Sequence, residues 1–224
     1  MEQKILFSWS GGKDSALALY ESQRAKKNQK LYFITTITQD YQRISMHGIR
    51  EVLLDKQIDS LEGEVRKIFI SKSSSNKEYE KKMKQALLNF KSKNILSIGF
   101  GDIFLEDLRR YREDKLRKLR MKAFFPLWKK DTKELAFRFI EKRFKAIVSC
   151  VDSCVLGKEF VGKQFDRSFL SKLPKGVDPC GENGEFHTFV YDGPNFKKKI
   201  SYKLGKIVLK DKRFYYCDLE PDSS

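Results

Sequence analysis

Residues 5–15 read Ile-Leu-Phe-Ser-Trp-Ser-Gly-Gly-Lys-Asp-Ser, and this stretch decides how the rest of the sequence is interpreted. Its first three residues are apolar, which predicts a short buried strand, and the Ala/Leu-rich residues after Ser15 predict a helix. Between them, Gly11 and Gly12 let the backbone turn sharply and bring its N–H groups close to a ligand, where a Cβ atom would clash. The stretch therefore predicts a strand, a tight glycine turn and a helix.

The side chains of this turn favour a phosphate-binding loop. Ser10 and Ser15 supply hydroxyl groups, Lys13 supplies a positive charge, and Asp14 can hold a cation that bridges phosphates. The start of the helix adds unpaired N–H groups and the positive end of the helix dipole, both of which suit an anion. The pattern is neither the Walker loop nor the Gly-x-Gly-x-x-Gly motif of dinucleotide-binding proteins. An ordinary glycine-rich turn is the alternative interpretation.

The composition is that of a globular protein with a strong positive charge. Hydrophobic residues make up 40% of the chain, and no apolar run approaches the ~20 residues of a membrane span. The N-terminus shows no secretion signal and the four cysteines form no Cys-x-x-Cys pair, so we expect reduced thiols and a cytoplasmic protein. A formal charge of +16 could attract nucleic acid. However, the lysines are spread along the chain and interleaved with acidic residues, as on solvated helix faces.

Strands and helices alternate along the first part of the chain. Patterns of β-branched and aromatic residues predict strands at 31–38, 65–70, 95–102 and 123–127. Helical patterns occupy 15–27, 50–61, 76–91 (with Asn76 as the cap) and 104–121. This alternation predicts an α/β fold with a Rossmann-like parallel sheet covered by helices on both faces, an α/β/α sandwich.

The pattern becomes less regular beyond residue 130. A helix at 132–143 and a strand at 146–151 could extend the sheet, and three further strands are predicted at 186–191, 200–209 and 214–219. We therefore place a soft boundary near 130. Residues 1–130 would form the nucleotide-binding domain, and residues 131–224 a smaller α+β domain.

Several polar residues should share the ligand-binding edge of the sheet. In parallel sheets ligands bind beyond the carboxyl ends of the strands. That rule places His47, Gly101 and Asp102 beside the turn at 10–15, and we predict all three as nucleotide contacts. Arg112 falls within an apolar helix stripe, where a guanidinium is costly unless it meets a carboxylate or a ligand phosphate. We predict a substrate contact for it, with an internal ion pair as the alternative.

A second cluster of unusual chemistry lies at residues 176–190, which read Gly-Val-Asp-Pro-Cys-Gly-Glu-Asn-Gly-Glu-Phe-His-Thr-Phe-Val. The three glycines predict a shaped loop that leads into a strand. On that strand, a period of two places Glu185 and His187 on one face, so that the carboxylate can orient the imidazole for proton transfer. A glycine-rich turn with charged caps is the alternative.

The same loop contains three further candidates. Glu182 is another candidate base, and Asp178 and Cys180 are candidate substrate contacts. The sequence assures no helix N-terminus or base next to Cys180, so it does not support a reactive thiolate. The Cys and His spacing gives no recognisable zinc ligand set.

These motifs resemble those of the diphthine–ammonia ligase family of PP-loop, or N-type, ATP pyrophosphatases. Ser-Gly-Gly-Lys-Asp-Ser at 10–15 is similar to the PP-loop. Asp-Pro-Cys-Gly-Glu-Asn-Gly-Glu-Phe-His-Thr at 178–188 looks like the C-terminal signature of the family, and Met-His-Gly at 46–48 and Pro-Leu-Trp at 126–128 also match. The resemblance runs nearly end to end. It implies an adenine-nucleotide α-hydrolase-like domain followed by a smaller substrate domain.

The resemblance also implies an ATP-dependent amidation. AMP is transferred to a substrate carboxylate, pyrophosphate leaves, and ammonia attacks the acyl-adenylate. The loop at 10–15 would hold the pyrophosphate of ATP, with Mg²⁺ at Asp14 bridging the phosphates. Lys13 and Asp14 would be catalytic together with Glu182, Glu185 and His187. Free ammonium is the expected nitrogen source, because no glutaminase domain is evident.

The acceptor is a separate part of this expectation. The named substrate of the family is a modified histidine on a translation elongation factor, but family members also occur in bacteria, and this short, Lys- and Phe-rich chain would suit a bacterial member. A PP-loop enzyme acting on tRNA is a less favoured alternative, because it leaves the C-terminal signature unexplained. A non-catalytic nucleotide sensor is another. A homodimer is compatible with the sequence, and no membrane partner is expected.

Overall fold

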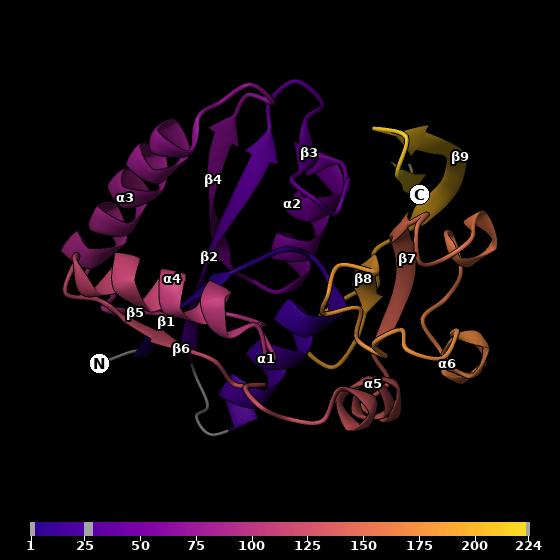
Figure 1. Cartoon of the computed structure of the whole chain (residues 1–224). Helices are drawn as coiled ribbons and strands as arrows, with labels where there is room; N and C mark the ends of the chain where they lie inside the picture. Colours follow the sequence, from indigo (N-terminus) through magenta and orange to yellow (C-terminus); the bar gives the residue numbers. More distant parts are fainter. Residues whose placement is uncertain (1–2, 25–28, 223–224) are drawn as a thin grey trace.

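The computed structural model describes residues 3–24 and 29–222 and contains two β-sheets (Figure 1). The first sheet has the strand order β3-β2-β1-β5-β6, with β4 also paired to β2. Its strands are β1 (Gln3–Ser8), β2 (Gln29–Thr38), β3 (Arg43–Ile44), β4 (Glu64–Ile70), β5 (Ser97–Gly99) and β6 (Lys122–Phe124). All of its pairings are parallel except that of the short β3 with β2. The mostly parallel α/β sheet expected from the sequence is confirmed.

Helices cover both faces of this sheet. They are α1 (Lys13–Arg24), α2 (Glu51–Ser60), α3 (Asn76–Ser92) and α4 (Glu106–Arg117). Successive strand residues point to opposite faces. Accordingly, Ile5 and Phe7 pack in the core that contains α1 and α2, while Leu6 packs in the core that contains α3 and the end of α4. The sheet is therefore the middle layer of the expected α/β/α sandwich.

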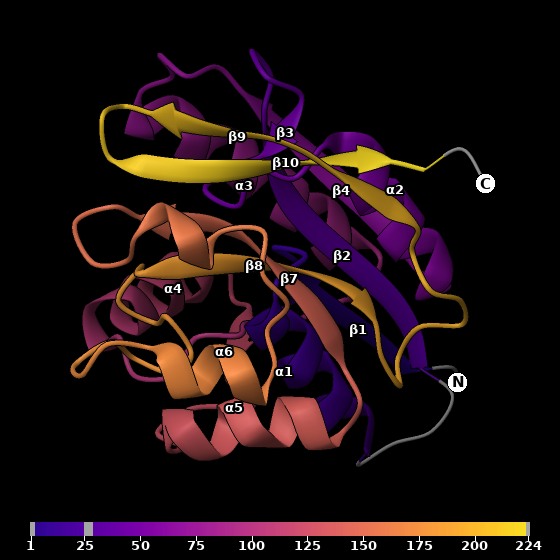
Figure 2. The same cartoon turned by 90° about the vertical axis from the view of Figure 1, so that its right-hand side faces the viewer.

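The second sheet is antiparallel and has the order β8-β7-β10-β9. Its strands are β7 (Lys145–Asp152), β8 (Phe186–Asp192), β9 (Tyr202–Lys210) and β10 (Phe214–Pro221). The last two form a long hairpin (Figure 2). The expectation that residues 146–151 could extend the first sheet is wrong. β7 is occupied on one side by β8 and on the other by β10, so it forms the centre of a separate sheet.

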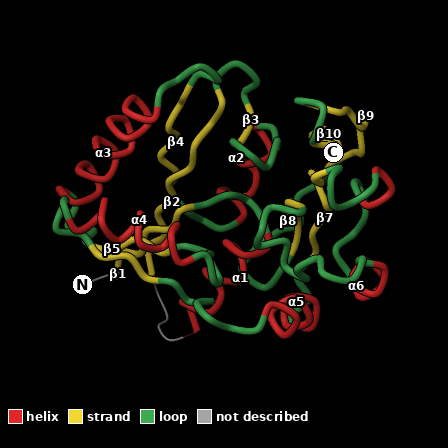
Figure 3. The backbone as a smooth tube through the Cα atoms, viewed as in Figure 1, coloured by secondary structure: helices red, strands yellow, loops and turns green. Residues whose placement is uncertain are grey.

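Mostly irregular chain connects β7 to β8 (Figure 3). It contains the 3₁₀ turn η1 (Lys158–Phe160) and the short helix α6 (Arg167–Lys172). The helix α5 (Thr132–Glu141) precedes β7 and is capped by the Asp131 side chain, which accepts a hydrogen bond from the N–H of Glu134. In the part of the chain that the structure describes, no helix has the length and apolar character needed to cross a membrane.

Some element boundaries differ from those expected. The cap of α3 is Ser75 and not Asn76, because the Ser75 hydroxyl accepts a 3.2 Å hydrogen bond from the N–H of Glu78. The strand expected at 95–102 has only three residues. The helix expected at 104–121 ends at Arg117, and the first helix ends at Arg24, with the rest of its expected span outside the described residues.

One hydrophobic core connects the two halves of the chain. Phe7, Ala16 and Leu53 belong to the same buried cluster as Phe139, Val148 and Phe189. Polar contacts add to this connection, since the Arg43 and Arg50 side chains both form ion pairs with Asp218 of β10. Because one core contains residues of both halves, the division near residue 130 stays a prediction. The second sheet packs against the layer formed by α1 and α2.

Candidate active site

The loop at residues 10–15, called here the phosphate loop, has the strand–turn–helix geometry expected from the sequence. Gly11 has a φ of +76°, in the left-handed region that favours glycine. The Ser10 hydroxyl accepts a 3.2 Å hydrogen bond from the N–H of Gly12 and lies 3.2 Å from the Ser15 hydroxyl. The Ser15 hydroxyl donates in turn to the Gly12 carbonyl, at 2.9 Å. The helix begins at Lys13, two residues before the expected start.

The turn after β5 packs directly on the phosphate loop. A Cβ atom on Gly101 would lie 2.8 Å from both the Asp14 carbonyl carbon and the Ser15 nitrogen. Only a glycine lets the two backbones approach this closely. The structure thus brings Gly101 beside the phosphate loop, as the sequence predicts.

Asp102 and Arg112 are ion-pair partners. The Arg112 Nε atom lies 2.8 Å from the Asp102 carboxylate, and its guanidinium lies 4.3 Å from the centroid of the Phe100 ring. The internal ion pair left open by the sequence is therefore present. Arg112 also lines a cavity between α3 and α4.

The Lys13 side chain is buried between the phosphate loop and the loop that contains Cys180. Its side chain is 4% exposed, and its ammonium donates to Asp14 at 2.8 Å and to the backbone carbonyl of Cys180. The rings of Phe165 and Phe186 lie next to each other beside this group, with centroids 5.7 and 5.2 Å away. Burial lowers the pKa of Lys13, but the Asp14 carboxylate outweighs that effect and the pKa is raised. The Lys13 ammonium thus links the phosphate loop, in the first half of the chain, to the loop that contains Cys180, in the second half.

The two histidines of the chain lie against each other beside the phosphate loop. The ring centroids of His47 and His187 are 4.6 Å apart, and His47 Nδ1 lies 3.2 Å from the carbonyl of Thr188. A Cβ atom on Gly12 would lie 2.7 Å from the His47 ring. Burial lowers the pKa of His47 to about 4 and that of His187 well below its usual range, so both imidazoles are neutral near pH 7.

Glu185 shapes the loop at residues 176–185, called here the signature loop. Its buried carboxylate accepts hydrogen bonds from the N–H of Asp178 at 3.1 Å, and from the N–H and side-chain amide of Asn183 at 3.0 and 2.9 Å. The expectation that Glu185 orients the His187 imidazole is wrong. Glu185 precedes β8, in the loop, so the strand periodicity does not extend to it.

The Asp178 carboxylate also accepts hydrogen bonds from backbone N–H groups of the signature loop. One carboxylate oxygen accepts from the N–H of Cys180 at 2.9 Å and from the N–H of Glu182 at 3.1 Å. The Cys180 thiol is buried and donates to the Thr132 carbonyl, and burial raises its pKa, so it is a neutral thiol. The structure does not bring this thiol to the cavity.

Glu182 connects the signature loop to the turn after β5. Its carboxylate accepts from the N–H groups of Ile103 at 2.7 Å and Phe104 at 3.3 Å. Burial, reinforced by the nearby Asp14 charge, raises the pKa of Glu182 to about 7, even though the two N–H donors oppose the shift. A carboxyl group with this pKa can exchange a proton near neutral pH.

Hydrogen bonds join β8 to the phosphate loop. The Thr188 hydroxyl accepts from the N–H of Lys13 at 3.0 Å, and the N–H of Val190 donates to the Gly11 carbonyl at 2.9 Å. The buried Gln57 amide donates to the carbonyls of both Gly11 and Val190. β8, which follows the signature loop, is therefore held against the phosphate loop, although the two are far apart in the sequence.

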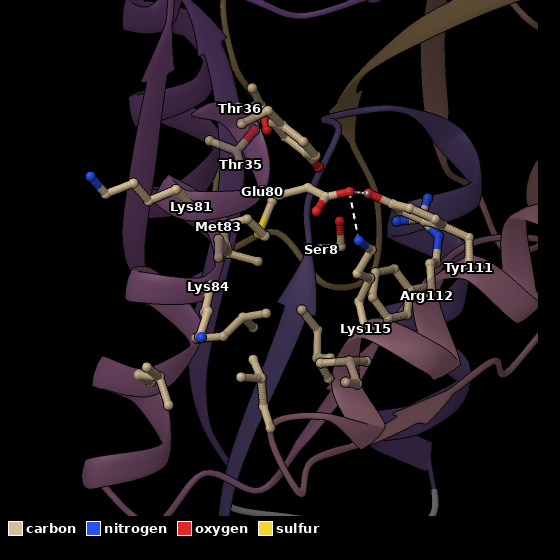
Figure 4. A pocket seen from close by; sticks show the side chains of 18 of the residues that line it. Ser8, Thr35, Thr36, Glu80, Lys81, Met83, Lys84, Tyr111, Arg112 and Lys115 are labelled. Atoms are coloured by element: carbon tan, nitrogen blue, oxygen red, sulfur yellow. Dashed lines mark hydrogen bonds and ion pairs between the residues drawn. The ribbon is translucent and has the colours of Figure 1, made fainter. Parts of the chain in front are cut away.

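A cavity of about 950 Å³ opens beside the phosphate loop, between α3 and α4 (Figure 4). Ser8 and Ser10 line one end, with Thr35, whose hydroxyl is buried and has no hydrogen-bond partner. Across the cavity, Glu80 of α3 meets Lys115 of α4 at 2.6 Å. Sequence reasoning missed these lining residues, apart from Ser10. The position of Ser8 and Thr35 near strand ends was an available signal, whereas nothing in the sequence pairs α3 with α4.

The residues beside the phosphate loop fit a Mg²⁺ ion held mainly by nucleotide phosphates. The structure describes no cluster of three or more His, Cys, Asp or Glu side chains suited to a metal, so no all-protein site is formed by the described residues. Mg²⁺ commonly uses only one or two carboxylates and takes its other ligands from phosphates and water. One Asp14 oxygen meets Lys13, which leaves the other available on a side chain that is 29% exposed.

Two family models match the chain across both halves. The diphthamide synthase N-terminal domain matches residues 3–123, and the diphthamide synthase C-terminal domain matches residues 131–220. The chain belongs to the diphthamide synthase family. The phosphate loop and the signature loop fall within the two matched segments of this family member.

Curated relatives agree with this assignment. A diphthine–ammonia ligase from Bos taurus is 33% identical over 120 residues, which cover 51% of this chain and 45% of the relative. The enzyme from Homo sapiens is 32% identical over 121 residues, with the same shares covered. The chain spans about half the length of the curated relatives it matches. Among solved structures, a U34-tRNA thiolase, NcsA from Methanococcus maripaludis, has a TM-score of 0.37 at 19% identity and covers 62% of this chain and 56% of that chain.

Proposed function

We propose that this member of the diphthamide synthase family is an ATP-dependent amide ligase. It adenylates a substrate carboxylate, releases pyrophosphate and amidates the acyl group with ammonia. The observation that carries the proposal is the hydrogen-bonded contact between β8 and the phosphate loop, which joins a nucleotide-binding element to the signature loop. An enzyme that attaches AMP to an acceptor must hold the nucleotide and the acceptor next to each other, so it needs these two elements in contact. The acceptor by analogy with the curated relatives is diphthine.

The first step forms a bond between a carboxylate oxygen and the α-phosphorus of ATP, and breaks the bond from that phosphorus to the pyrophosphate oxygen. The Ser10 and Ser15 hydroxyls and the loop N–H groups hold the leaving pyrophosphate, where donors aimed at developing charge are most effective. Asp14 would hold Mg²⁺, which neutralises phosphate charge when it is bound.

The second step needs ammonia rather than ammonium. Ammonium gives one proton to a base, the nitrogen forms a bond to the acyl carbon and loses a second proton to solvent, and AMP leaves with its oxygen. Glu182 suits the base because its pKa is near 7, whereas the neutral His187 imidazole, with its lowered pKa, is the weaker acceptor. Arg112 lines the cavity, is held by its ion pair with Asp102, and would position the nucleotide.

The test is pyrophosphate release from Mg-ATP with ammonium, in the presence and absence of an elongation factor that carries diphthine. We expect the factor to stimulate release, with AMP formed in equal amount. Asp14→Asn should abolish release and keep the fold, while Lys133→Gln, an exposed substitution outside the site, should leave the rate unchanged. ATP binding without any pyrophosphate release, with this and other carboxylic acids, would instead support a nucleotide sensor.

A further inference from the structure

The cavity continues between α3 and α4 well beyond the nucleotide end. It runs from Ser10 to Leu119 and Arg120, which follow the last turn of α4. At a rise of about 1.5 Å per residue, Lys77 and Lys91 of α3 lie about 21 Å apart along its wall. The reaction proposed above requires only the end near the phosphate loop. The other end is therefore a groove, called here the α3–α4 groove, for which that reaction has no use.

Unpaired positive charges line both sides of the α3–α4 groove. On one side, α3 presents Lys77, Lys81 and Lys84, and on the other lie Lys118 and Arg120. Within the described parts of the chain, none of these five side chains makes an ion pair or a hydrogen bond. Glu80 is the one carboxylate among the residues described as lining the cavity, and it is already paired with Lys115. The groove therefore attracts anions.

The floor between these two rows of charge is aliphatic. Met83, Leu87 and Leu88 of α3 and Leu116 of α4 line it, and Leu88 is 42% exposed (Figure 4 shows Met83 and Lys84 facing the cavity). An apolar floor between two cationic rims complements a helix with an apolar stripe and carboxylates on both sides of that stripe.

We propose that the α3–α4 groove binds an acidic amphipathic helix of another protein. The charge argues against a second copy of this chain, since each copy carries +16. Phosphates of an RNA strand would meet the cationic rims. The cavity lining also contains aromatic rings, those of Trp9, Tyr79, Phe100 and Tyr111, but the four aliphatic side chains of the floor give the bases nothing on which to stack. Only the acidic helix uses the rims and the floor together. This binding is independent of the ligase reaction.

The test uses the full chain and a fluorescent synthetic peptide of about 18 residues, with leucines at helical spacing and glutamates on both sides of them. We expect binding in the micromolar range at low salt by fluorescence anisotropy. The double variant Lys81→Glu/Lys84→Glu should weaken it about tenfold or more. The control Lys133→Glu/Lys206→Glu makes the same change in net charge on exposed side chains elsewhere, and should change the affinity less than about twofold.

Four results would overturn the proposal. One is equal weakening by the control pair, which would reveal general charge attraction. Another is equal binding of a peptide with the same composition but permuted leucines, or no effect of Leu88→Asp, because the aliphatic floor would then have no part. A single-stranded RNA that binds more tightly than the peptide and loses affinity in the Lys81→Glu/Lys84→Glu variant would assign the groove to nucleic acid. Thermal melting of each variant establishes that it is folded.

Discussion

At the scale of single residues, the position of Lys13 is the main departure from expectation. A lysine in a phosphate-binding turn predicts a contact with the ligand, yet its ammonium is held between Asp14, the Cys180 carbonyl and two aromatic rings. The residue therefore acts as a buried connection between the phosphate loop and the signature loop.

Lys13→Met should destabilise the protein by about 3 kcal/mol, because it removes one partner of a buried ion pair and leaves the Asp14 carboxylate unpaired. Urea denaturation measures the change in unfolding free energy. The matched substitution Lys133→Met, at an exposed position, should alter it by no more than about 0.5 kcal/mol. An equally small effect of Lys13→Met would mean that the buried contact contributes nothing to stability.

Glu182 should make stability depend on pH. Its pKa is about 7 in the folded protein and near the ordinary 4.5 when unfolded, so between these values the native state holds a proton that the unfolded state has released. Stability due to this group is therefore fully present below pH 4.5 and declines as the pH rises to 7. After allowance for partial exposure, we expect a loss of about 1–2 kcal/mol.

Glu182→Gln removes the titrating group, so the variant should lose less stability than the parent between about pH 5 and pH 8. Urea denaturation at these two pH values measures both slopes. Parallel slopes would show that Glu182 does not take up a proton in the folded protein.

At the scale of the elements, predictions succeeded where the structure depends on neighbouring residues. The strand–turn–helix at 5–15 follows from local apolar periodicity and from Gly11 and Gly12, and the structure contains it. Contacts between residues far apart in the sequence could not be predicted from local periodicity. Lys13 meets Cys180 across 167 positions, and the two partners of β7 could not be chosen from periodicity. Glu185 was misassigned because a period of two was extended to a residue before the start of β8.

The approach of the β5–α4 turn to the phosphate loop can be tested at Gly101. Gly101→Ala places a methyl group 2.8 Å from the backbone of Asp14 and Ser15, so one of the two segments must shift. We expect the affinity for ATP to fall about tenfold or more, measured by equilibrium binding. Gly157→Ala is the control, because Gly157 has a φ of −68° and a Cβ atom there meets only the carboxylate of the exposed, flexible Glu159 side chain, and it should change the affinity less than about twofold. Unchanged affinity in Gly101→Ala would separate this turn from the nucleotide site.

At the scale of the whole molecule, the shared core should make the two halves fold together. Phe139, Val148 and Phe189 are buried in the cluster that also contains Phe7 and Leu53. A fragment of residues 131–224 would expose that apolar surface to water. We expect the isolated fragment to show no cooperative urea transition by circular dichroism, and the full chain to show a single one. A cooperative transition of the fragment at a similar urea concentration would indicate an independent domain.

The central claim is that the joined phosphate loop and signature loop transfer AMP to a carboxylate. The most direct measurement uses an elongation factor whose diphthine carboxylate carries ¹⁸O, with Mg-ATP and ammonium, and mass spectrometry of the products. The account predicts AMP that has gained one ¹⁸O atom, pyrophosphate that has gained none, and an amide formed in equal amount. Formation of ADP with ¹⁸O in inorganic phosphate, or AMP without the label, would contradict it.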